Sequence, residues 1–171
     1  SDASIWQRAA GTVGDTIYDF DHYINLAQSG NATISQLAQP ADGIPFARRA
    51  LQPDASAKRL GFCQILEARD CLAFRSSQLV FVPEIRCSAA VTVRVAILAW
   101  TSTLDAPPRD PVNNWTSTNY TAGNFFIAGV IPVAVGAVAL AANTWTDIPV
   151  SSISAGGISA PSTMNNLYFV V

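Results

Sequence analysis

The sequence predicts an all-β fold: an antiparallel β-sandwich of jelly-roll type, formed as a single domain by residues 1–171. Three observations support this prediction. Many short segments alternate apolar and polar residues with the period of two that is typical of strands. Clusters of Gly, Asn, Pro and Ser separate these segments at short intervals. No segment combines a helical period with a capping residue at its start, and short strands at this spacing are typical of a sandwich.

The clearest alternation lies between Gln78 and Trp100. Val91–Trp100 places apolar side chains on one face of an extended chain, which indicates that this face lies in the core. Ser88–Ala90 is short enough to turn the chain back, so we expect Leu79–Cys87 and Val91–Trp100 to pair as a hairpin. On the face opposite the core, this hairpin would bring together four side chains: Glu84, Arg86, Arg94 and Trp100.

The first third of the chain predicts a second hairpin. Phe20–Gln28 alternates with His22 on its apolar face, so we expect a buried or interfacial imidazole. A Ser-Gly-Asn turn follows, and Ala32–Gln39 returns beside the first strand. Before this hairpin we expect a short strand, Ser4–Arg8, with Trp6 in the core.

The middle of the chain alternates between strands and long connections. Residues 40–55 contain three prolines and predict a long loop with a short extended piece around residues 44–51. Lys58–Leu66 resumes a strand, and Glu67–Ser77 has room for one helical turn. Residues 101–117 form the longest irregular segment, and a loop of this length inside a compact domain is usually mobile or functional.

The last third predicts short strands near Asn124–Ala128, Val130–Val135, Ala137–Leu140, Thr144–Val150 and Asn166–Val171. Within it, residues 125–142 carry no charge and are about as long as the shortest membrane span of roughly 18 residues. Because Pro132 and Gly136 interrupt this segment, two strands joined by a turn explain it better than a membrane helix does. We therefore expect no membrane insertion.

Charge is scarce and unevenly distributed. Charged residues make up 13% of the chain, against roughly 25% in an ordinary soluble protein. After Asp110 the only charged side chain is Asp147. A monomer seldom leaves so much surface uncharged, so we expect a homo-oligomer. The net charge of −2 and the scattered cations give no basic stripe, which argues against nucleic-acid binding.

No cofactor, metal or catalytic residue is expected. Three cysteines without a CxxC pair and a single His favour reduced, packed thiols over a disulfide or a zinc site. The aspartate clusters lack a calcium-loop signature and are typical of solvated turns: Asp15, Asp19 and Asp21, and Asp105 with Asp110. A glycosidase needs two carboxylates facing across a cleft, and nothing in the spacing of Glu67 and Glu84 places them together.

Several short stretches follow one another in a recognisable order: WQR, FDHY, RLGFCQILEARDC, QLVFVPEIRCSAAVTVRVAILAW, DPVNNWTSTNYTAGNFFIAG, ALAANTWTDIPV and MNNLYFVV. In this order they resemble the jelly-roll, carbohydrate-binding-like modules of tailed-phage fibre and spike proteins, over nearly the whole chain. The resemblance implies a virion protein on the particle surface, in a tail or head fibre or spike. It also implies a trimer that contacts other virion proteins and host surface polysaccharide. The aspartate-arginine-aromatic stretch of the family stands here as Asp21-His22-Tyr23.

A sugar site needs exposed aromatic planes beside side chains that hydrogen-bond pairs of hydroxyls. Two groups of residues match this requirement. The first is the outer face of the central hairpin, with Trp100, Arg94, Glu84 and Arg86. The second is the long loop, with Trp115, Asn113, Asn114 and Asp110. The alternative for the first group is a cross-strand ion pair with Trp100 covering the core.

Two other functions fit the same sequence. One is a purely structural capsid, decoration or connector protein without glycan contact. The other is an accessory carbohydrate-binding module of a secreted glycosidase, which predicts a monomer. Glycan binding separates the first alternative from an adhesin, and the oligomeric state separates the second.

Overall fold

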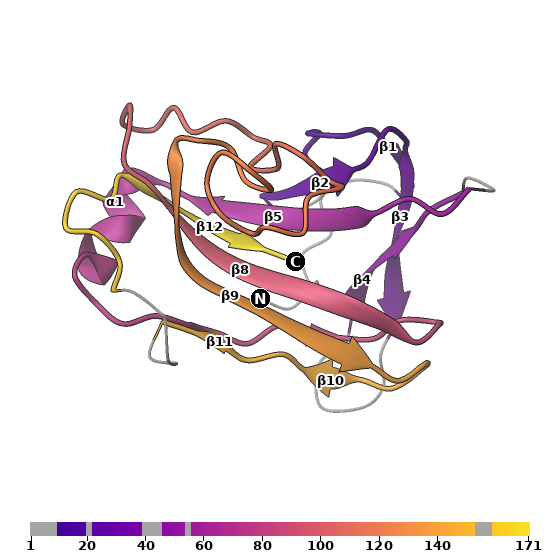
Figure 1. Cartoon of the computed structure of the whole chain (residues 1–171). Coiled ribbons are helices and arrows are strands. Elements are labelled where there is room, and N and C mark those ends of the chain that lie inside the picture. Colours follow the sequence, from indigo (N-terminus) through magenta and orange to yellow (C-terminus); the bar gives the residue numbers. More distant parts are fainter. Residues whose placement is uncertain (1–9, 20–21, 39–45, 54–55, 153–158) are drawn as a thin grey trace. The chain divides into compact units, whose positions relative to one another are not determined.

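The fold is all-β, as the sequence predicts. The computed structural model describes residues 10–19, 22–38, 46–53, 56–152 and 159–171 (Figure 1). Contacts group the chain into two compact units, Ser1–Gln64 and Ile65–Val171, which are described in turn. The jelly-roll connectivity and the single-domain organisation over residues 1–171 stay predictions. The predicted strand Ser4–Arg8, with Trp6, lies outside the described residues.

In the first unit, β1, β3 and β4 form a three-stranded sheet in the order β1-β3-β4, and β2 pairs with β5 in another sheet. The strands are β1 (Gly11–Val13), β2 (Tyr23–Ala27), β3 (Ala32–Ala38), β4 (Phe46–Leu51) and β5 (Leu60–Leu66). The buried side chains of Ala32 and Ile34 on β3 form a small core with Tyr23 of β2 and Leu60 of β5. The predicted hairpin between β2 and β3 is therefore wrong. The turn after β2 exists, but it connects β2, which pairs with β5, to β3 in the three-stranded sheet.

A buried ion pair ties β4 to the segment before β2. The Arg48 guanidinium donates from Nε to Asp19 Oδ2 at 2.7 Å and from a terminal nitrogen to Asn25 Oδ1 at 3.3 Å. It also lies 4.9 Å from the centre of the Phe62 ring. Burial lowers the pKa of Arg48, and the neighbouring Asp19 carboxylate opposes that effect. The paired charges and the Asn25 amide thus form one network inside this unit.

His22 does not lie in a buried strand position, so that prediction is wrong. Its side chain is exposed, and its backbone takes a φ of 68° in the turn directly before β2. Left-handed backbone marks a turn rather than a strand. The strand period begins only at Tyr23, from where the next four residues are buried.

In the described residues of the second unit there are a short helical segment and seven strands. The elements are α1 (Ala68–Cys71), η1 (Leu72–Phe74), β6 (Val80–Phe81), β7 (Glu84–Ile85), β8 (Val91–Trp100), β9 (Val130–Leu140), β10 (Thr146–Asp147), β11 (Val150–Ser151) and β12 (Asn166–Val170). β8 lies between β12 and β9, and both of these neighbours run antiparallel to it. The helical turn predicted within Glu67–Ser77 is confirmed.

The central hairpin is not formed, and this is the largest correction to the sequence prediction. Leu79–Cys87 is extended, but it pairs with the segment before β12 and not with β8. β6 pairs with β11 and β7 pairs with β10, both antiparallel. Between and beyond these ladders, Ile148 N donates to Pro83 O at 2.9 Å and Ser152 N donates to Leu79 O at 2.9 Å.

These pairs form a second layer over the sheet of β12, β8 and β9, so this unit is sandwich-like. One face of β8 supplies Val95, Ile97 and Ala99 to a core that also contains Ile148 and Val150 from the opposite layer. Figure 1 shows β10 and β11 on one side of the sheet. The ring of Phe81 on β6 lies 4.7 Å from that of Phe169 on β12, which joins the two layers directly.

β9 is one continuous strand of 11 residues, not two strands joined by a turn. Pro132 is accommodated because the register with β8 shifts at that point, between Ile97 and Leu98. At Gly136 a Cβ atom would stand 3.3 Å from a methyl carbon of Val150, so the missing side chain lets β11 approach closely. None of the helices in the described part of the chain has the length and apolar character needed to span a bilayer.

Candidate functional site

The long loop between β8 and β9, residues 101–129, covers the second face of the sheet (Figure 1, salmon to orange). Tyr168 on β12 donates from its hydroxyl to Pro108 O at 2.7 Å. The Trp100 ring packs against the backbone of Gly129, and its Nε1 donates to Thr103 O at 2.8 Å. β8 is therefore buried on both faces from residue 95 to residue 100. The loop is a fixed part of the fold rather than a free tip.

Within this loop, residues 110–126 are held by their own polar side chains. Asp110 Oδ1 accepts from Val112 N at 2.7 Å, and Asn114 Oδ1 accepts from Thr116 N at 3.0 Å. Asn113 is held twice: its backbone N donates to Phe125 O at 2.7 Å and its amide donates to Asn124 O at 3.0 Å. Asn and Asp form such turns readily because their side chains reach nearby backbone amides. We call residues 110–126 the Asn-rich segment.

Four aromatic rings gather in the Asn-rich segment. Phe125 and Phe126 are buried, and their ring centres lie 5.1 Å apart. Tyr120 lies 4.6 Å and Trp115 lies 6.1 Å from Phe125, measured between ring centres. Both outer rings are half-buried. The two phenylalanines thus anchor the segment, while the indole and the phenol each keep part of their surface open to solvent.

Arg94 brings a positive charge to this aromatic group. It projects from β8, opposite Ala137 of β9, and its side chain is exposed. The guanidinium carbon lies 4.3 Å from the centre of the Tyr120 ring, within the range of a cation–π contact. The structure therefore joins one residue of the predicted sheet-face group to the predicted loop group.

The other three residues of the sheet-face group do not join Arg94. Glu84 lies on β7 opposite Asp147, and exposed Arg86 lies just beyond that strand, where it donates to Asn143 Oδ1 at 3.5 Å. Trp100 is 9% exposed and covered by the loop, so it offers no open plane for stacking. The prediction that these side chains share one face with Arg94 is wrong, because it depended on a hairpin of Leu79–Cys87 with β8 that is not formed.

The loop residues predicted for the site do lie together. Trp115 and Asp110 are half-buried, whereas Asn113 and Asn114 are exposed in the same segment. The sequence analysis missed Tyr120, although Asn, Thr and Ser residues surround it in the sequence as they surround Trp115. It also missed the pairing of Arg94 with Tyr120, since no local pattern reports a contact between a strand and a distant loop.

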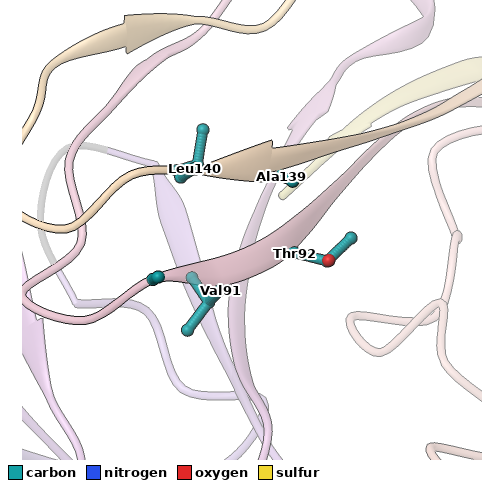
Figure 2. A pocket seen from close by; sticks show the side chains of 5 residues that line it. Val91, Thr92, Ala139 and Leu140 are labelled. Atoms are coloured by element: carbon teal, nitrogen blue, oxygen red, sulfur yellow. The ribbon is translucent and has the colours of Figure 1, made fainter.

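Beyond Arg94, the outer face of β8 and β9 is uncharged and mostly apolar. Val135, Ala137 and Ala139 of β9 are exposed, as is Thr92 of β8. Figure 2 shows Val91 and Thr92 of β8 opposite Leu140 and Ala139 of β9 at the end of this pair of strands, around a shallow depression. The depression carries no titratable group, so it offers no acid–base chemistry.

The aspartates considered for calcium make structural hydrogen bonds. Asp15 Oδ1 accepts from Ala27 N at 2.8 Å, and Asp105 Oδ1 accepts from Ala68 N at 2.8 Å and from the Asn166 amide at 3.0 Å. In the described ranges, no three His, Cys, Asp or Glu side chains gather in a way that would hold a metal ion. Asp21 lies outside those ranges.

Comparisons of the chain with protein-family models, with curated proteins and with solved structures gave no match.

Proposed function

We propose that this chain is a glycan-contacting module of a phage particle, in a tail or head fibre or spike, and that it binds host surface polysaccharide without catalysis. The binding surface consists of the Asn-rich segment together with Arg94. The chain self-associates through uncharged surface and adjoins other virion proteins. The resemblance of the sequence to phage fibre and spike modules supplies the virion setting of this proposal.

One observation carries the choice of surface. Trp115 and Tyr120 are half-buried rings beside exposed asparagines, on a segment that is held by its own hydrogen bonds. Aromatic planes stack on the apolar face of a sugar ring, and amides hydrogen-bond its hydroxyls. Because the segment is already ordered, binding a sugar costs less conformational entropy than it would on an unstructured loop.

A glycan array of bacterial surface polysaccharides tests the proposal. The wild-type chain should bind at least one glycan, and Trp115→Ala should weaken that binding by about 10-fold or more. Trp145→Ala is the matched control because Trp145 is a half-buried indole between β9 and β10, outside the Asn-rich segment. Equal loss in both variants would contradict the assigned surface, and cleavage of a bound glycan would contradict binding without catalysis.

A purely structural role in the particle is the second candidate. The exposed, uncharged side chains of β9 favour it, because such a surface suits contact with further protein. The array separates the two: a structural protein gives no glycan signal, and it still self-associates in light scattering. A stable monomer that binds glycan would instead favour the accessory module of a glycosidase.

A further inference from the structure

Arg94 is the one charged residue in the sequence of β8, β9 and residues 111–129, and Asp110 is the one charged residue of the Asn-rich segment. Because Arg94 is exposed whereas Asp110 is half-buried, the surface near Arg94 has a positive local potential, although the chain as a whole has a net charge of −2. The surface therefore favours an anionic ligand over a neutral or cationic one.

The Arg94 guanidinium is positioned but not neutralised. Its contact with the Tyr120 ring, at 4.3 Å, orients the group without cancelling its charge. Among the described residues no carboxylate forms an ion pair with Arg94, unlike Arg48, which pairs with Asp19, and Arg69, which pairs with Asp70. Asp110, the nearest acidic residue of the Asn-rich segment in sequence, accepts a hydrogen bond from Val112 N. The N–H donors of Arg94 thus remain available to a ligand.

We propose that the glycan is acidic, and that Arg94 binds the carboxylate of a uronic or sialic acid residue. This inference rests on the proposed function. A guanidinium presents two parallel N–H donors that match the two oxygens of a carboxylate. The rings of Tyr120 and Trp115 lie on the same Asn-rich segment, where they contact the sugar ring that carries the carboxylate.

The test compares acidic polysaccharides with their carboxyl-reduced forms. Polygalacturonate, hyaluronate and polysialic acid are the probes, each used intact and after reduction of its carboxylates to alcohols. Biolayer interferometry measures binding to the full chain at low and at high salt. We expect one acidic polymer to bind about 10-fold or more tightly than its reduced form, and the difference to shrink at high salt.

Variants separate a specific contact from general charge. Arg94→Gln should lose the preference for the intact polymer, and Arg94→Lys should keep part of it, because an ammonium retains the charge but not the paired donors. Arg86→Gln is the matched control, since Arg86 is also exposed in the second unit but lies outside this surface. Equal loss in Arg86→Gln would overturn the proposal.

The outcomes for the two proposals differ. Equal binding of intact and reduced polymers, or array hits restricted to neutral glycans, would overturn the acidic ligand and leave glycan binding in place. No binding to any of these polymers or to the array would overturn both.

Discussion

Replacing Gly129 with alanine tests how the long loop is held against the sheet. A Cβ atom at this position would stand 2.9 Å from Cη2 and 3.3 Å from Cε3 of Trp100, and closer still to Cζ3. Carbon atoms pack favourably only at about 3.5–4.0 Å. The indole cannot move aside freely, because it is 9% exposed and its Nε1 donates to Thr103 O at 2.8 Å.

The expected cost follows from these contacts. Overpacking a filled site costs about 1–3 kcal/mol, and a ring shift that breaks the indole hydrogen bond adds about 1 kcal/mol. We therefore expect Gly129→Ala to lower the free energy of unfolding by about 2 kcal/mol or more. Because the loop carries the proposed binding surface, the glycan binding proposed above should weaken as well.

Urea denaturation followed by tryptophan fluorescence measures the effect. Two glycine controls separate the clash from other consequences of adding a methyl group. Gly11→Ala should change stability by no more than about 0.5 kcal/mol, since nothing lies within 4 Å of the added carbon. Gly123→Ala also meets nothing, but its φ of 76° should cost about 1 kcal/mol. If Gly129→Ala is as stable as the wild-type chain, the loop is not packed against Trp100 as described.

Three further predictions concern other parts of the chain. Arg48→Met leaves a buried carboxylate without its partner, so urea denaturation should show a loss of about 3–5 kcal/mol, and a loss below about 1 kcal/mol would contradict the buried network. The Ala68 amide, and then the Asn166 side chain, hold the pKa of Asp105 below its usual value. The ionised Asp105 therefore stabilises the fold above its unfolded pKa of about 3.9, and this stabilisation is lost as the pH falls through the lower folded pKa. In Asp105→Asn the free energy of unfolding should depend less on pH in this acidic range. An unchanged pH dependence of stability in this range would refute the role of Asp105. Ala137→Lys places a charge on the exposed face of β9 and should reduce self-association in sedimentation velocity, whereas an unchanged oligomer would exclude β9 from the interface.

The positions of most strands could be predicted from the sequence, but their partners could not. Alternation with a period of two reports which side chains share a face, and this located β5, β8 and β12. It contains no information about which strand lies alongside. The short Ser88–Ala90 turn favoured a local hairpin, whereas in the structure Phe81 of β6 and Ile85 of β7 pack against the core from the opposite layer.

The candidate site shows the same limit. Composition predicted a loop over residues 101–117, but the loop extends to residue 129, and the strand predicted near Asn124–Ala128 is not formed. Composition could not reveal that Trp100 is covered, because the residue that covers it, Gly129, lies at the far end of the long loop in the sequence. The contact between Arg94 and Tyr120 spans 26 positions of the sequence and is visible only in the fold.

The contacts that attach the long loop to the sheet involve other residues than those that the loop exposes to solvent. Its attachments, at Pro108 and Gly129, face the sheet and lie outside the stretch from Asn113 to Thr121, most of which faces solvent. Substitutions in that stretch leave these two attachments untouched, whereas the side chains of Asn113 and Asn114 also hold the segment itself. A library that varies this stretch but keeps Asn113 and Asn114 should therefore preserve the conformation of the loop.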